Sequence, residues 1–209
     1  MRQPLVDATA RPGSRRGRFA CVAGTAAVLL LLAGCATPPG TRLHSLLPAT
    51  TGGPAHMVVA NLPAPAARLA TLALPAAVAQ PQMLVRQDDG SLLLLEHERW
   101  VAPLADELRL LLQQRLDALP ASPAGAQPWQ LALEVTRWEG RLGAGARLEA
   151  RWDLRRDGAA AVHCGVAIDQ PAGPGAAALA ASHAAAAAAL AQAVADSVGA
   201  ATSARGCRG

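Results

Sequence analysis

The sequence predicts a single α/β domain in which a mixed or largely antiparallel sheet of about five to six strands carries two main helices. Three observations predict this class. Short runs that alternate apolar and polar residues are typical of strands buried on one face. The segment 103–120 places its leucines at helical spacing, and the segment 176–198 is long and dominated by alanine. These patterns identify the elements but leave the order of the strands open.

The first strands are predicted at 69–74, 82–87 and 91–96, because these apolar runs are bounded by proline or by turn residues. The last two flank Asp88-Asp89-Gly90, which is a typical turn of a β-hairpin. A further short strand is an option at 42–47.

A helix is predicted next, between Pro103 and Pro120. Proline suits the first helical position, where its missing N–H is not needed, and it cannot continue a helix at the other end. One face of the helix carries Leu104, Leu108, Leu111, Leu112, Leu116 and Leu119.

Three strands are predicted to follow as a meander, at 129–138, 146–155 and 159–168. Their apolar sides carry Trp129, Leu131, Leu133 and Val135, then Leu148, Ala150, Trp152 and Leu154, then Val162, Cys164, Val166 and Ile168. Charged residues alternate with the second set, so that side is expected to face water.

The closing helix is predicted over 176–198, since alanine has the highest intrinsic helix propensity. Gly199 is expected to end it as the residue after the C-cap. Cys164 is expected to be a small buried side chain and Cys207 an exposed thiol in a polar tail. A disulfide between them is the less favoured alternative.

The first 34 residues are typical of a lipoprotein signal peptide. Three arginines at 15, 16 and 18 precede an apolar run over 19–32, which is shorter than the ~20 residues that a membrane-spanning helix needs. The run ends in Leu32-Ala33-Gly34-Cys35, which resembles the lipobox of bacterial lipoproteins. That resemblance implies cleavage before Cys35 and acylation of Cys35, which anchors the chain in membrane lipid. The alternative is an ordinary signal with a chance cysteine at its border.

Residues 35–65 are predicted to be the lipidated N-terminus and a flexible tether, because they are rich in Pro, Gly, Thr and Ala. Residues 66–199 are predicted to form the domain, and 200–209 a disordered tail. Ala36 follows the cysteine, where retention at the inner membrane is typically associated with aspartate. We therefore expect the outer membrane, with the domain on its periplasmic face.

The net charge of +4 belongs largely to the signal. Removing its five arginines and one acid from 19 basic and 15 acidic residues leaves 14 of each. A neutral chain with interspersed charges offers no electrostatic footprint for nucleic acid, so nucleic-acid binding is excluded.

Catalytic motifs are missing from the sequence. No serine of the mature chain lies in a G-x-S-x-G or S-x-x-K context, and the run from His97 to Val101 lacks the second histidine of H-E-x-x-H. His97, between Glu96 and Glu98, is interpreted as a solvated strand end. His163 and Cys164 point to opposite sides of a strand and cannot share a metal. We predict no enzyme activity, no cofactor and no metal site.

Three stretches together resemble the ABC-type transport auxiliary lipoproteins of the PqiC-like, or YmbA-like, family. The first stretch consists of Leu74-Pro75, Pro81-Gln82-Met83-Leu84-Val85-Arg86, Leu94 to Glu96, Arg99-Trp100 and Pro103-Leu104. The second consists of Arg137-Trp138-Glu139-Gly140 together with Leu148 to Leu154. The third is the alanine-rich helix, which contains Ser182 and Leu190. The family often has Y-L-D-R where Ala77-Val78-Ala79-Gln80 stands here. An aromatic residue and an ion pair are therefore missing from that loop.

The resemblance implies an outer-membrane-anchored subunit that docks onto an MCE-domain transporter protein and serves lipid transport between the membranes and envelope integrity. Arg99 and Trp100 are interpreted as structural, with Trp100 in the core or at the helix entry and Arg99 paired with Glu96. Homo-oligomer formation stays open. The alternative function is a stand-alone lipid-binding carrier, and an envelope hydrolase is the disfavoured third class.

Overall fold

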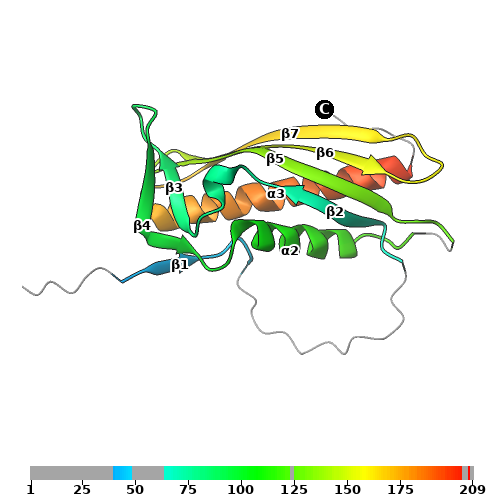
Figure 1. Ribbon diagram of the computed structural model, residues 1–209, viewed down its shortest axis with the longest axis horizontal. Helices are drawn as coiled ribbons and strands as arrows, with labels where there is room; N and C mark the ends of the chain where they lie inside the picture. Colours follow the sequence, from blue (N-terminus) through cyan, green and yellow to red (C-terminus); the bar gives the residue numbers. More distant parts are fainter. Residues whose placement is uncertain (1–39, 49–63, 123–124, 204–206, 208–209) are drawn as a thin grey trace, which may run out of the picture. The chain divides into compact units, whose positions relative to one another are not determined.

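The computed structural model describes residues 40–48, 64–122, 125–203 and 207, and it confirms the predicted α/β class with two main helices (Figure 1). The strands are β1 (Arg42–His44), β2 (Ala67–Ala73), β3 (Gln82–Arg86), β4 (Leu92–Trp100), β5 (Trp129–Arg141), β6 (Gly145–Arg155) and β7 (Val162–Pro171). The helices are α2 (Leu104–Asp117) and α3 (Ala176–Thr202), with a 3-10 turn, η1, at Ala76–Val78.

The strands of the described residues are divided between two sheets. One has the order β1-β4-β3 and the other the order β2-β5-β6-β7. The predicted hairpin of β3 and β4 is present, and β5, β6 and β7 form the predicted antiparallel meander. Two parallel pairs join distant segments, because β1 lies beside β4 and β2 lies beside β5.

Helix α2 is present within the predicted range, but it begins at Leu104 and ends at Asp117, so Leu119 lies beyond it. Pro103 is the N-cap, and its carbonyl accepts hydrogen bonds from the N–H groups of Asp106 and Glu107. The leucine face is buried, with Leu108 and Leu112 fully covered. This face packs on the same core as the inward side chains of β5 and β6.

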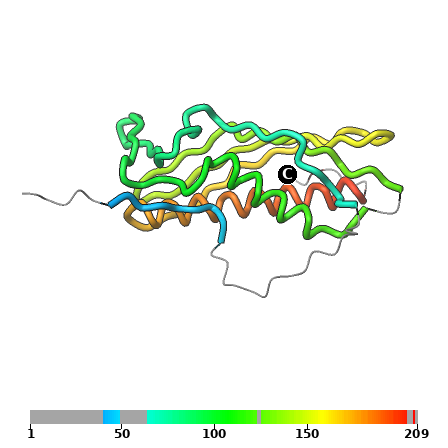
Figure 2. The backbone as a smooth tube through the Cα atoms, turned by 60° about the horizontal axis from the view of Figure 1, so that its bottom comes forward, coloured from blue at the N-terminus to red at the C-terminus, as the bar shows by residue number. Residues whose placement is uncertain are grey.

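Helix α3 runs along the sheet that contains β5, β6 and β7, and α2 lies beside it (Figures 1 and 2). Its length and apolar composition would suffice to cross a membrane, but half of its most apolar window is buried in the domain. Small alanine side chains let it approach the sheet closely. It is therefore the central core helix of the described part of the chain.

Gly199 does not end α3, contrary to the sequence prediction. The helix continues through Gly199 to Thr202, and Gly199 is not among the glycines with a positive φ. Val198 is fully buried, and its carbonyl accepts a hydrogen bond from the Thr202 hydroxyl, so the next turn is held by packing and by a side chain.

Residues 40–48, which the sequence analysis assigned to the tether, belong to the folded unit. The short strand left open at 42–47 is present as β1, and Leu46 is only 2% exposed. Two acidic side chains hold this segment, as described below.

Cys164 and Cys207 form a disulfide, with their Cα atoms 5.8 Å apart. The expectation of two separate thiols is therefore wrong. β7 is an edge strand of its sheet, so Cys164 is only half-buried. Both cysteines line one hollow with residues of the last turns of α3. Strand alternation predicted which side of β7 carries the Cys164 side chain, but it did not predict how far that side chain is buried.

Candidate functional site

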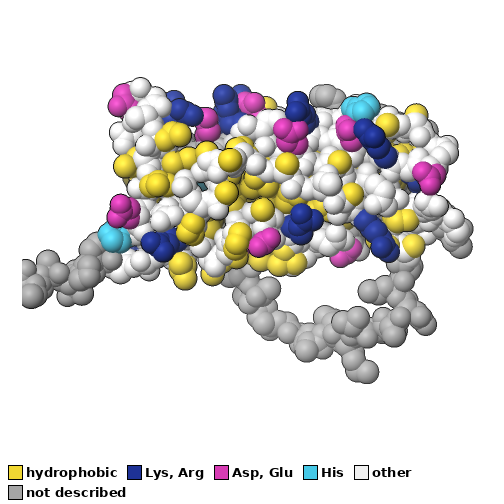
Figure 3. All heavy atoms as spheres, in the orientation of Figure 1, with side chains coloured by type: hydrophobic (Ala, Val, Ile, Leu, Met, Phe, Trp, Pro, Cys, Tyr) yellow, Lys and Arg dark blue, Asp and Glu magenta, His cyan; other side chains and the backbone are white. Residues whose placement is uncertain are grey.

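Charges of both signs lie side by side on the outer surface of β5, β6 and β7 (Figure 3). Alternation along these strands places apolar side chains against the helices and charged side chains on the opposite face. The result is an ionic surface rather than a random distribution of charges, because each acid meets at least one arginine.

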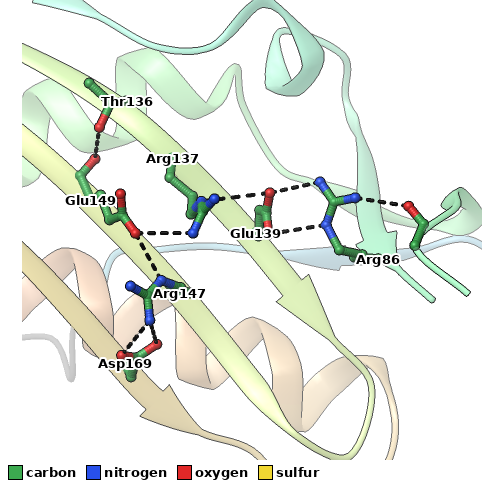
Figure 4. Close-up of polar contacts among 8 residues, drawn as sticks. Arg86, Thr136, Arg137, Glu139, Arg147, Glu149 and Asp169 are labelled. Atoms are coloured by element: carbon green, nitrogen blue, oxygen red, sulfur yellow. Dashed lines mark hydrogen bonds and ion pairs between the residues drawn. The ribbon is translucent and has the colours of Figure 1, made fainter. Parts of the chain in front are cut away.

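The first part of this surface joins β3 to β5 (Figure 4). Arg86 donates two hydrogen bonds to Glu139, over 2.7 Å to Oε1 and 3.1 Å to Oε2. A third donor nitrogen of Arg86 reaches the carbonyl of Gly90 in the hairpin turn, at 2.9 Å. Because both oxygens of Glu139 are engaged in parallel, the orientation of the pair is fixed.

The second part continues across β5, β6 and β7. Arg137 bridges Glu139 and Glu149, with nitrogen–oxygen distances of 3.8 and 3.1 Å. Arg147 bridges Glu149 and Asp169, at 2.9 and 3.0 Å. We call this chain of six side chains the ion-pair network: Arg86, Glu139, Arg137, Glu149, Arg147 and Asp169.

Two members of the network, Glu139 and Arg147, have pKa values shifted in favour of their charged forms. The hydrogen bonds from Arg86 hold the pKa of the Glu139 carboxyl below its usual range. The pKa of Arg147 is raised, first by its hydrogen bond to Glu149 and then by the charge of Asp169. Glu139 and Arg147 therefore act as fixed charges at neutral pH.

A hollow of about 840 Å³ opens beside the network. Its charged lining is Arg86, Arg137, Glu139, Arg141, Arg147 and Asp169, with backbone from the ends of β5, β6 and β7. The ion-pair network contains three arginines and three carboxylates, and the lining of the hollow adds one more arginine, Arg141. Arginines therefore outnumber carboxylates by one at this place. The excess of one arginine makes this hollow more favourable for an anionic group than for a cation.

A buried aromatic cluster supports the network from below. His183 of α3 is 2% exposed and stacks on Trp138, while Trp100 meets it edge-on with ring centroids 5.8 Å apart. Burial lowers the pKa of His183 to about 4, so the ring is neutral at pH 7. Gly140 leaves room for the ring, since a Cβ there would lie 2.7 Å from Nε2 of His183.

A second polar site clamps the N-terminal segment to the domain. Glu98 meets His44 at 2.6 Å and Arg42 at 3.1 Å, and its pKa is lowered first by the hydrogen bond with His44. Glu107, which is 3% exposed, accepts hydrogen bonds from the hydroxyl of Ser45 and the backbone N–H of Leu46, both at 2.8 Å. We call these contacts the N-terminal clamp.

Comparison with known proteins identifies the family. A family model described as "ABC-type transport auxiliary lipoprotein component" matches residues 46–195. The chain belongs to this family. The match begins at Leu46, the residue that the clamp fixes, and covers nearly all of the folded unit. No curated protein matches the chain.

Solved structures agree with this auxiliary-lipoprotein assignment at the level of the fold. A Xanthomonas campestris protein of the DUF330 family is 19% identical, with a TM-score of 0.51; the match covers 65% of this chain and 93% of that one. A protein described only as uncharacterized is 20% identical, with a TM-score of 0.50 and coverage of 60% and 86%. At such identities the similarity shows the fold alone.

Six of the residues that carry the family resemblance lie in the two clusters just described. Arg86, Arg137 and Glu139 belong to the ion-pair network, and Trp100, Trp138 and Gly140 surround His183. Arg99 donates to the backbone carbonyl of Glu96 rather than to its carboxylate. In the loop that departs from the family pattern, η1 buries Val78, and Gln80 donates to the carbonyl of Ala77.

Other predicted residues of this auxiliary lipoprotein lie elsewhere. Cys35 falls outside the described residues. His97 is exposed on β4, and His163 pairs with Asp153 at 2.6 Å on the outer face of the meander. In the part of the chain that the structure describes, no group of three His, Cys, Asp or Glu residues is placed to hold a metal ion.

Sequence reasoning missed Glu107 and His183, although both interrupt an apolar stripe. Glu107 is three residues after Leu104 and four before Leu111, and His183 is four residues after Leu179. A polar residue at such a position must find a partner or be neutral, because burying a charge alone is costly. That signal was present in the sequence.

Proposed function

We propose that this chain is a non-catalytic subunit, lipid-anchored through Cys35 to the periplasmic face of the outer membrane, that docks onto an MCE-type protein of an ABC-linked lipid transport system and so contributes to envelope integrity. The observation that carries the proposal is the family match, which spans residues 46–195 and describes an auxiliary lipoprotein component of transport. Family membership supports the transport role; the anchor, the membrane and the MCE partner are our inference.

The N-terminal clamp supports an anchored subunit. Arg42 is only seven positions after Cys35, so an extended chain spans at most about 25 Å between them. The domain would therefore stay close to the membrane that holds the acyl chains, and would not range freely on a long tether. Such confinement raises the effective concentration of the domain near a partner at the same membrane.

The ion-pair network supports docking. Fixed charges that are already paired in the free subunit give orientation and specificity to a protein interface. Arg141 adds a positive charge at the hollow, which suits an acidic side chain of the partner. Trp138 and His183 beneath it make the surface rigid, which lowers the entropic cost of binding.

Two buried serines illustrate why we propose no hydrolytic role. Ser182 accepts from the N–H of Ala146 and donates to the carbonyl of Gln170. Ser197 accepts from the indole of Trp152 and donates to the carbonyl of Val194. Both hydroxyls are committed to structural hydrogen bonds. A stand-alone lipid carrier would need an enclosed apolar cavity, whereas the hollow beside the network is open and lined by charged groups.

Two measurements test the proposal. Labelled palmitate should enter the wild-type chain and not Cys35→Ala; equal labelling of both would overturn the anchor. Crosslinking in intact cells followed by affinity purification should recover an MCE-domain protein with the wild type. Recovery should fall at least tenfold with Arg141→Glu and be unchanged with Arg109→Glu, an exposed arginine on α2. Recovery of no MCE-domain protein with the wild type would overturn the docking proposal.

A further inference from the structure

The β3–β4 hairpin carries leucines on its solvent side. Leu84 lies directly opposite Leu94 in the antiparallel register, and Leu92 lies opposite Arg86. Their neighbours Met83 and Val85 point inward and are buried, so alternation turns Leu84, Leu92 and Leu94 outward. Leu92 is 50% exposed, Leu94 is 40% exposed and Leu84 is half-buried. We call these three residues the leucine patch.

The leucine patch contrasts with the outer face of the neighbouring sheet. There the outward positions of β5 and β6 carry arginine and glutamate, as expected for a solvated surface. In Figure 3 apolar side chains are visible at the end of the molecule where β3 and β4 lie, as well as over its middle. Leu43 of β1 is a further exposed leucine near this end, at 63%. Exposed leucines grouped on one hairpin favour an interaction site.

The position of the patch relative to the N-terminal clamp indicates what covers it. The same strand, β4, carries the patch at Leu92 and Leu94 and pairs with β1 at its other end, through Glu98, Arg99 and Trp100. Glu98 is four positions after Leu94, which is about 13 Å along a strand. The chain that leads to Cys35 therefore leaves the domain close to the patch.

Chain length then brings a lipid surface within reach. The proposed acyl chains on Cys35 lie at most about 25 Å from Arg42, as argued above. A bilayer that holds them passes near the strand that carries the leucines. Lateral contact between the patch and this bilayer needs no unfolding of the clamp.

Charge selects the kind of lipid. Glu98 is paired with Arg42 in the N-terminal clamp, and the rest of the segment 82–100 contains Asp88, Asp89 and Glu96 against Arg86 and Arg99. An acidic hairpin is repelled by anionic lipids, whereas leucines can enter the interface of a zwitterionic membrane and carboxylates can meet its ammonium groups. We propose that the leucine patch lies against a zwitterionic lipid surface and orients the domain on its membrane. This inference rests on the proposed acylation of Cys35.

Fluorescence on vesicles tests the contact. The full-length acylated protein is reconstituted on phosphatidylcholine vesicles that contain a nitroxide-labelled lipid, with an environment-sensitive dye on Leu94→Cys or, in a second variant, on Leu92→Cys. Because Cys164 and Cys207 are joined, the introduced thiol can be labelled selectively. The matched controls are Leu142→Cys and Leu110→Cys, at positions 47% and 46% exposed. Leu142 lies in the connection of β5 and β6, and Leu110 lies on α2.

The dye at position 94 or 92 should be quenched by the nitroxide lipid at least threefold more than the dye at 142 or 110. Replacing a third of the phosphatidylcholine by phosphatidylglycerol should reduce this quenching. Equal quenching at all positions, or no quenching at 92 and 94 in protein that floats with the vesicles, overturns the inference and leaves the anchor standing. Stronger quenching on the anionic vesicles overturns it as well. Failure of the wild type to float overturns the acylation of Cys35 and the inference with it.

Discussion

The imidazole of His183 lies parallel to the indole of Trp138, at an interplanar angle of 3° and with ring centroids 5.1 Å apart. The two residues come from α3 and β5, so the stack joins the core helix to the strand that carries Arg137 and Glu139. His183 therefore holds the ion-pair network on one side and α3 on the other in one rigid unit, and its burial favours the neutral form of its ring.

Acidification is expected to destabilise the fold through His183. The pKa of His183 is lowered from 6.5 to about 4 in the folded protein. Between these two pH values the imidazole is protonated in the unfolded chain but stays neutral in the folded chain. The free energy of unfolding should fall as the pH drops from 6.5 to about 4, by about 3 kcal/mol in total at 1.36 kcal/mol per pKa unit. Urea denaturation at pH 7.5 and 4.5 measures this loss.

Two variants isolate the histidine. His183→Leu should lose less stability between these two pH values than the wild type does, because nothing at position 183 can be protonated. His97→Gln, at an exposed site, should behave as the wild type. Glu98 and Glu139, whose pKa values are lowered, begin to lose their stabilising effect as the pH approaches 4.5, but they do so equally in both proteins and cancel in the comparison. An unchanged pH response in His183→Leu would exclude this role.

Gly140 and Gly199 should respond oppositely to alanine. At Gly140 a methyl group would meet His183 at 2.7 Å and Leu179 at 3.0 Å, so overpacking should lower the free energy of unfolding by about 1–3 kcal/mol. At Gly199 nothing lies within 4 Å and the backbone is helical, so alanine should stabilise by about 1 kcal/mol. Urea denaturation at pH 7.5 compares the two, and an equally stable Gly140→Ala variant would contradict the assigned packing.

The sequence predicted those parts of the fold that local periodicity controls. Alternation from Trp129 to Leu154 indicated both the strands and their buried faces, and leucine spacing indicated α2. The parallel pairs of β1 with β4 and of β2 with β5 were not predictable, because they join segments about 60 residues apart through side chains that show no pairing preference. The division into two sheets follows from these pairings.

The site was predictable only in part for a related reason. The motif residues Arg137 to Gly140 were recognised, but their common role depends on His183, more than 40 residues away. A histidine within an alanine-rich helix indicates that its ring packs against another side chain, but it does not indicate which residue provides that side chain. The partner of Cys164 was likewise hidden, since only the fold places the end of α3 beside the edge strand β7.

Loss of the disulfide should destabilise the domain without unfolding it at pH 7.5. The bond closes a loop with a sequence separation of 43 residues, for which the chain-entropy estimate is about 4 kcal/mol. Cys207→Ser should lower the free energy of unfolding by up to that amount. Reduction with dithiothreitol should lower the wild type to the level of the variant and leave Cys207→Ser unchanged. If dithiothreitol lowered the free energy of unfolding equally in the wild type and in Cys207→Ser, the disulfide would not be the source of this stability.

Removal of the Glu107 side chain should release the N-terminal clamp. In Glu107→Ala the buried N–H of Leu46 loses its acceptor, and the Ser45 hydroxyl loses its partner. An unpaired buried donor costs about 1–3 kcal/mol, and here the cost can be avoided if the segment around β1 detaches from the domain. Trypsin should then cut after Arg42 at least tenfold faster than in the wild type, while cleavage after Arg151, in the central strand β6, stays slow.

Glu96→Ala, which removes an exposed carboxylate from the neighbouring strand β4, is the control and should leave both rates unchanged. Cleavage of Glu107→Ala at the wild-type rate after Arg42 would mean that the β1–β4 ladder and Glu98 hold the segment without Glu107, whereas parallel acceleration at Arg151 would indicate loss of the whole fold instead of a local release.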